Sequence, residues 1–79
     1  MNKKEFLDIL YEQLSGQMPE GNVAAHVQYY RNYIEDAVTQ GRTETEVLNE
    51  LGDPRLIART LLDTDSTASG NPQTTGSYS

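Results

Sequence analysis

The chain has 79 residues and carries 12 acidic against 6 basic side chains, which gives a formal net charge of −6. This length allows at most one small domain, and the lack of cysteine excludes disulfides, thiolate metal sites and cysteine chemistry. The acidic balance argues against a nucleic-acid binder that relies on bulk positive charge.

The first predicted element is an amphipathic helix from Asn2 to Leu14, in which apolar side chains recur at three- and four-residue spacings between charged ones. Asn2 is a suitable N-cap, and Glu5 follows at the spacing of a capping box. Gly16 can adopt the left-handed conformation that closes such a helix, so we expect the helix to end near Ser15.

The second and longest predicted helix lies between Pro19 and Gly41. Pro19 suits a first helical position and Asn22 is a competing N-cap; we favour the start at Pro19. Gly41 marks the end of the segment. Apolar residues at steps of four, three, four and three form the stripe that this helix should bury: Val23, Val27, Tyr30, Ile34 and Ala37.

A short third helix is predicted to follow. Thr43 and Glu46 repeat the capping-box spacing directly before a new apolar set, so Thr43 should be the N-cap. Gly52 should end this helix. The apolar set is Val47, Leu48 and Leu51.

The fourth predicted helix begins directly after that glycine. Asp53 can accept backbone N–H bonds as its cap, and Pro54 suits its first position, where the missing N–H costs nothing. We expect this helix to end near Asp63. Its apolar residues are Leu56, Ile57, Ala58, Leu61 and Leu62.

The composition changes sharply after the fourth helix. All apolar residues except Ala68 and Tyr78 lie in residues 1–63, and no residue after Asp65 is charged. Such a stretch cannot bury enough apolar area to offset its ordering entropy. We therefore predict a helical domain, residues 1–63, and a flexible Ser/Thr/Gly-rich linker or tail, residues 64–79. No segment alternates strictly between apolar and polar residues, so the predicted fold class is all-α: a compact bundle of four helices, the last two short and joined by a Leu-Gly-Asp-Pro turn.

Three blocks carry a recognisable order and spacing: residues 1–7, residues 29–37, and the run from 41 to 58 that contains Leu-Gly-Asp-Pro. Together they resemble the HAAS family of small helical signalling domains, formerly a domain of unknown function. The resemblance covers about residues 1–63, and the Leu-Gly-Asp-Pro junction is its most specific part. It departs from the family at residues 21–26, Gly-Asn-Val-Ala-Ala-His, where the family has a run of charged residues after its proline.

The resemblance implies a non-enzymatic module at the cytoplasmic N-terminus of a bacterial membrane protein, often encoded beside a PadR-like transcriptional regulator. A PadR-like regulator is then a candidate protein partner, and the membrane would be reached only through a segment outside this chain. From the residues themselves, no stretch approaches the roughly 18 to 20 apolar residues of a membrane span, and the N-terminus lacks a signal peptide's apolar run. We therefore expect a soluble, cytoplasmic domain.

No constellation of residues predicts catalysis, a cofactor or a metal site. His26 is the only side chain whose ordinary pKa lies near neutrality, and one histidine makes neither a catalytic triad nor a metal site. It shares a helical face with Tyr30 and Tyr33, so a proton-sensing cluster is the alternative to the structural histidine that we favour. Neighbouring carboxylates point to different sides of their helices and indicate a solvated acidic face: Glu35 with Asp36, and Glu44 with Glu46. We expect no enzymatic activity and no cofactor.

Tyr29 and Tyr33 lie four residues apart and flank the buried stripe of the second helix. They either complete the hydrophobic core or offer an aromatic anchor to a partner, and we favour the core boundary. With His26 they form the candidate partner surface.

The two short helices also resemble a helix-turn-helix, in which Arg55 and Arg59 could reach phosphates. Nearby acidic residues would repel a polyanion, so no nucleic acid is expected as a partner: Glu44, Glu46, Glu50, Asp53 and Asp63. The sequence therefore favours a protein–protein interaction or signalling module. The alternatives are a small helix-turn-helix DNA-binding domain and a self-associating helical domain, and the oligomeric state stays open.

Overall fold

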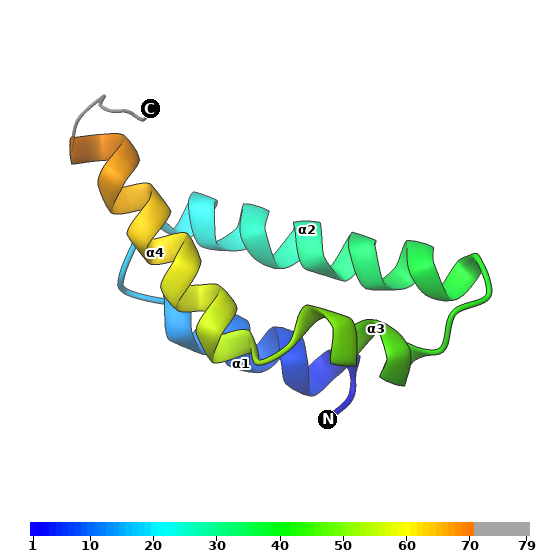
Figure 1. The fold of residues 1–79 in the computed structure, drawn as a ribbon. Coiled ribbons are helices and arrows are strands. Elements are labelled where there is room, and N and C mark those ends of the chain that lie inside the picture. The colour runs from blue at the N-terminus through cyan, green and yellow to red at the C-terminus, as the bar shows by residue number, and fades with distance from the viewer. Residues whose placement is uncertain (71–79) are drawn as a thin grey trace, which may run out of the picture.

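The fold is all-α, as predicted. The structure, a computed structural model, describes residues 1–70. Four helices follow one another in the chain (Figure 1): α1 (Lys3–Leu14), α2 (Glu20–Thr39), α3 (Glu44–Leu51) and α4 (Pro54–Gly70). Within residues 1–70, an isolated bridge of β type joins Ser15 and Met18 in the α1–α2 connection.

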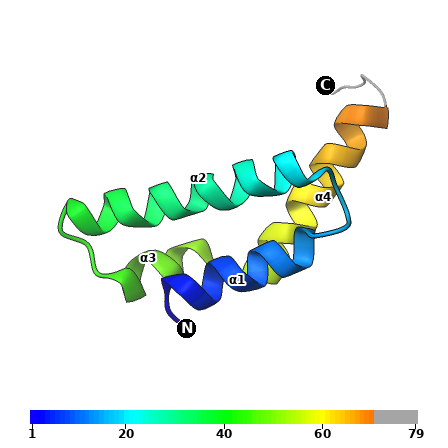
Figure 2. The same cartoon turned by 180° about the vertical axis from the view of Figure 1, so that it is seen from behind.

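α1 is the central element of the bundle. It packs against α2 and α4 and touches α3, whereas α4 makes little direct contact with α2 or α3. Figure 1 shows α3 and α4 on the near side of α1 with α2 running above it, and Figure 2 shows α1 at the front of the opposite view. The far end of α4 extends away from the other helices, beside the start of α2.

The core is built around one face of α1. Phe6, Leu10 and Leu14 are fully buried and Leu7 almost so, because their spacing places them on a single side of the helix. The other helices complete the buried core with Val23, Ile34, Val47, Leu48 and Ala58. Partly buried side chains pack around it: Met18, Val27, Tyr30, Ala37, Leu51, Ile57, Leu61 and Leu62. The predicted buried stripe of the second helix is therefore confirmed.

Leu56 is the exception among the apolar residues predicted for the fourth helix, since 58% of its surface is exposed. It lies two positions before the buried Ala58, and two helical steps of about 100° place the two side chains on nearly opposite sides of α4.

Both predicted capping boxes are confirmed. In the first, the Glu5 N–H donates to Asn2 Oδ1 at 2.8 Å, and the Asn2 N–H donates to Glu5 Oε1 at 3.2 Å. In the second, the Glu46 N–H donates to Thr43 Oγ1 at 3.1 Å, and the Thr43 N–H donates to Glu46 Oε1 at 3.0 Å. Each box satisfies N–H groups that the first turn of a helix leaves without partners.

α2 begins one residue later than predicted, at Glu20. Pro19 takes the N-cap position in an extended conformation, and Asn22 lies within the first turn instead of capping it. At the other end, Gly41 has φ +106°, the Arg42 N–H donates to the Ala37 carbonyl at 3.1 Å, and the Gly41 N–H donates to the Val38 carbonyl at 3.0 Å. This pair of bonds is a Schellman motif, which satisfies the last carbonyls of the helix.

The turn between α3 and α4 forms as predicted. Gly52 has φ +84°, the Arg55 N–H donates to Asp53 Oδ1 at 2.8 Å, and Pro54 is fully buried at the first position of α4. Asp53 therefore satisfies one of the free N–H groups of α4.

The fourth helix is longer than predicted. It continues through Gly70 instead of ending near Asp63, because no proline or glycine interrupts residues 55–69 and extending an existing helix costs far less than starting one. Of the predicted tail, residues 64–79, the part from 71 to 79 lies outside the described residues.

Candidate functional site

The predicted partner-surface residues all lie on α2, but they differ in burial. Tyr29 exposes 59% of its surface and Tyr33 37%, while His26 is half-buried nearer the core. The rings of Tyr29 and Tyr33 have their centroids 6.5 Å apart and are tilted by 36°. Neither tyrosine belongs to the buried core, so the pair lies on the surface at the edge of the core.

Tyr30 is the tyrosine that packs into the core. Its ring lies 6.3 Å from the ring of Phe6 on α1, and burial raises the pKa of its phenol. Tyr29 contacts Tyr30 in an edge-to-face arrangement, with centroids 5.0 Å apart and an interplanar angle of 89°. Tyr29 thus contacts a ring that itself packs against the core.

Tyr33 is anchored to α3 through a shared carboxylate. The Tyr33 hydroxyl donates to Glu50 Oε1 at 3.3 Å, and Arg42 Nη1 donates to the same oxygen at 2.8 Å. The hydrogen bond from Arg42, its positive charge and the Tyr33 hydroxyl together lower the pKa of Glu50. Because the three residues come from α2, the following loop and α3, no local sequence pattern could have indicated this cluster.

Asp36 extends the aromatic pair along the same side of α2. It follows Tyr33 by three residues and Tyr29 by seven, spacings that share one helical face. Asp36 is exposed, and among the described residues no hydrogen bond or ion pair engages its carboxylate. We call Tyr29, Tyr33 and Asp36 the α2 patch. From the sequence alone, Asp36 is predicted to lie in a solvated acidic face. Its spacing of three and seven residues from the tyrosines is the signal that would also have placed it on their side of the helix.

Two of the other carboxylates in that predicted acidic face hold helices together. The Lys3 backbone N–H donates to Glu44 Oε2 at 2.8 Å, and Lys3 Nζ donates to Glu35 Oε2 at 2.9 Å. Lys3 on α1 is therefore tied to both α3 and α2. Glu35 is exposed and Glu44 half-buried, so both carboxylates lie at the surface, and tertiary packing in addition brings them to the start of α1.

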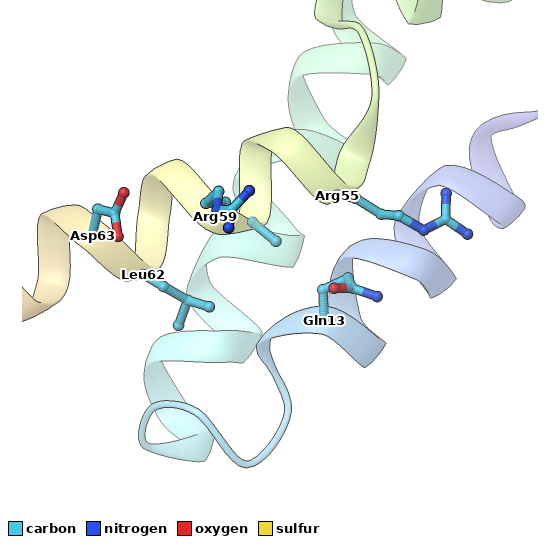
Figure 3. A pocket seen from close by; sticks show the side chains of 6 residues that line it. Gln13, Arg55, Arg59, Leu62 and Asp63 are labelled. Atoms are coloured by element: carbon cyan, nitrogen blue, oxygen red, sulfur yellow. The ribbon is translucent and has the colours of Figure 1, made fainter.

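The two arginines of the helix-turn-helix alternative line an opening of about 390 Å³ between α1 and α4. Figure 3 shows Arg55 extending from α4 toward α1, with Gln13 on the α1 side. Arg55 Nη1 also lies 3.8 Å from Asp53 Oδ1, and Asp63 lines the same opening as Arg59. Both arginines are exposed, and the acidic side chains near them, Asp53 and Asp63, reduce the attraction that they offer to a phosphate backbone.

Among the side chains that the structure describes, those of residues 1–64, no group of three or more His, Asp or Glu is placed to hold a metal ion. Within residues 1–70, no helix combines the length and the apolar character needed to cross a membrane.

Comparison with protein-family models gives a match to HAAS over residues 5–60. Comparisons with curated proteins and with solved structures give no match. The matched stretch includes the α2 patch, the α3–α4 turn and the segment 21–26, where the chain departs from the family pattern. Because the match spans well over half of the sequence, the chain belongs to the HAAS family.

Proposed function

We propose that this HAAS domain is a non-enzymatic protein–protein interaction module of a signalling protein, and that the α2 patch is its contact surface. The observation that carries the proposal is the exposure of Tyr29, at 59% of its surface, beside a second exposed ring 6.5 Å away. Exposed aromatic side chains are enriched among the residues that dominate the energy of protein interfaces.

The α2 patch differs from the other exposed apolar side chains of the domain. These other side chains are Met1, Tyr11, Val38 and Leu56. Single exposed apolar residues are ordinary on protein surfaces and call for no explanation. Tyr29 and Tyr33 are instead paired, and each also contacts another residue of the domain, Tyr30 and Glu50 respectively. A rigid aromatic pair loses little side-chain entropy on binding, which favours its use as an anchor.

The chemistry beside the patch supports a binding role without catalysis. Glu50 accepts a hydrogen bond from the Tyr33 hydroxyl, and its pairing with Arg42 lowers its pKa. A carboxylate with a lowered pKa is a poor proton acceptor, so Glu50 is badly suited to general base catalysis at neutral pH. The proposal therefore includes neither a reaction nor a cofactor.

The wider setting that we propose is the cytoplasmic N-terminal part of a bacterial membrane protein, with a PadR-like regulator as the candidate partner. Family resemblance supports this setting. The arrangement of the helices is compatible with it, because α4 leaves the bundle beside the start of α2 (Figure 1) and the α2 patch lies further along that helix. A tether that continued from α4 would leave the patch accessible.

Site-specific photo-crosslinking in the full-length protein tests the proposal. A photoreactive phenylalanine analogue replaces Tyr29 in one variant and Glu12, an exposed residue of α1, in the control. We expect one defined protein partner to be crosslinked from position 29 and not from position 12, with loss of that product when Tyr33→Ala is added. Equal products from both positions, no product, or a product with a second copy alone would contradict the proposal.

A further inference from the structure

We propose that the α2 patch recognises a basic segment of its partner, with an arginine or lysine side chain seated on the Tyr29 and Tyr33 rings and paired with Asp36. This inference rests on the proposed function and adds the chemistry of the partner.

The two rings offer a surface that attracts a cation. Tyr29 and Tyr33 are both exposed and only 36° from parallel, with their centroids 6.5 Å apart, so the two rings are close enough for one approaching group to contact both. The face of a tyrosine ring carries partial negative charge and attracts a guanidinium or ammonium group within about 6 Å.

Asp36 supplies the full negative charge beside these rings. Its two acidic neighbours are already occupied, since Glu35 accepts a hydrogen bond from Lys3 and Glu50 is paired with Arg42. Asp36 has no such partner among the described residues. The patch therefore presents one uncompensated carboxylate next to an aromatic pair, which is the combination that a basic side chain satisfies.

The basic side chain on α2 itself, Arg31, cannot occupy the cation position beside the tyrosine rings and Asp36. Arg31 lies two residues from Tyr29 and two from Tyr33, so it projects about 160 to 200° away around the helix. Four other basic side chains are paired with carboxylates within the domain: Lys3, Lys4, Arg42 and Arg55.

The overall charge selects a basic partner over a second copy of the chain. At a net charge of −6, two copies repel one another, whereas a positively charged segment is attracted over the range of the Debye length. Complementary charge also directs the encounter and the register of binding.

The test uses the ¹⁵N-labelled 79-residue chain and an alanine-based helical peptide that carries arginine at every fourth position. We expect saturable shifts in the backbone amide signals, centred on positions 29, 33 and 36. The same peptide with glutamate in place of arginine should produce none. Binding should weaken several-fold when the salt concentration rises from about 50 to 300 mM.

Matched variants then locate the contact. Asp36→Asn and Tyr29→Ala should each raise the dissociation constant about threefold or more. Glu12→Gln removes the same charge as Asp36→Asn from an exposed position on α1, and should have a clearly smaller effect. Equal weakening by Asp36→Asn and Glu12→Gln, or shifts spread over all acidic positions, would show nonspecific attraction and overturn the inference.

Failure of this inference can be told apart from failure of the proposed function. If the arginine peptide produces no shifts while position 29 still crosslinks to one partner, the basic-segment inference is wrong and the interaction module stands. If sedimentation shows a dimer that Tyr29→Ala abolishes, the patch binds a second copy and both proposals are wrong.

Discussion

Lys3 and Glu44 join the first turns of two helices that are distant in the sequence: the Lys3 N–H, at the start of α1, donates to the side chain at the start of α3. The positive N-terminal end of the α1 dipole thus lies against the carboxylate of Glu44, which is itself the first residue of α3. Because this hydrogen bond is partly buried, its loss should lower the free energy of unfolding by a measurable amount.

Glu44→Ala should lower the free energy of unfolding by about 1 kcal/mol, since it leaves the Lys3 N–H without its acceptor. Glu44→Gln retains an acceptor oxygen and should cost clearly less. Glu35→Gln weakens only the half-exposed ion pair with Lys3 Nζ and should change stability by less than about 0.5 kcal/mol. Urea denaturation measures all three; equal values for Glu44→Ala and Glu44→Gln would contradict this role of the bond.

Asp53→Ala should cost roughly 1 kcal/mol, the usual effect of losing a helix cap, because the Arg55 N–H loses its acceptor. Asp53→Ser keeps an oxygen in a capping position and should retain most of the stability. The melting midpoint of each variant reports the difference, and an unchanged midpoint for Asp53→Ala would exclude a capping role.

Gly52→Ala and Gly21→Ala should shift stability in opposite directions. A methyl group meets no atom within 4 Å at either position, so backbone conformation alone decides the outcome. Gly52 has φ +84° and ψ −157°, a region that is essentially restricted to glycine, where an L-residue is strained by about 1 to 3 kcal/mol. Gly21 lies in α2, where alanine is favoured by about 0.5 to 1 kcal/mol. Chemical denaturation of the pair tests the assignment, and destabilisation by both substitutions would refute it.

Tyr29→Ala and Tyr30→Ala should separate a surface role from a core role. Tyr30 packs against Phe6, so its truncation should cost about 2 kcal/mol or more. Tyr29 is mostly exposed, and its truncation should cost less than about 1 kcal/mol. If Tyr29→Ala were as destabilising as Tyr30→Ala in urea titrations, Tyr29 would be a structural residue and a poor candidate for a binding anchor.

The Glu50 cluster predicts a specific dependence of stability on pH. The pKa of Glu50 is lower in the folded chain than its ordinary value of 4.5, because Arg42 and Tyr33 favour the ionised form. A lowered pKa contributes stability above the ordinary value, and this contribution is lost as the pH falls through the folded pKa. Wild type should therefore exceed Glu50→Gln in stability at pH 7, and the difference in the free energy of unfolding should shrink progressively as the pH falls below the ordinary value of 4.5. A difference that stays constant as the pH falls from 7 into the acid range would contradict the ion-pair origin.

Local signals in the sequence were sufficient for most of the helix boundaries. Asn2 with Glu5 and Thr43 with Glu46 form bonds within one turn, so their spacing alone predicts them. The start of α2 is predicted at Pro19 and lies one residue later, at Glu20, so the proline locates this helix boundary to within one residue.

Features that depend on tertiary packing could not be predicted in this way. Leu56 belongs to an apolar set, yet which face of α4 is buried depends on where α1 lies. Tyr33 and Glu50 are 17 residues apart, and Lys3 and Glu44 are 41 apart. No local rule relates residues at such separations, so the anchoring of the α2 patch became visible only in the folded arrangement.

The central position of α1 has a consequence for how the domain is made. During synthesis α1 leaves the ribosome before every helix that covers it, and α4, one of its main packing partners, begins only at Pro54. The part of the apolar face of α1 that packs against α4 must therefore remain uncovered until nearly the whole domain has been translated. Completion of the fold is then a late, all-or-none event, and the amides of α1 should be among the last to exchange with solvent in the finished domain.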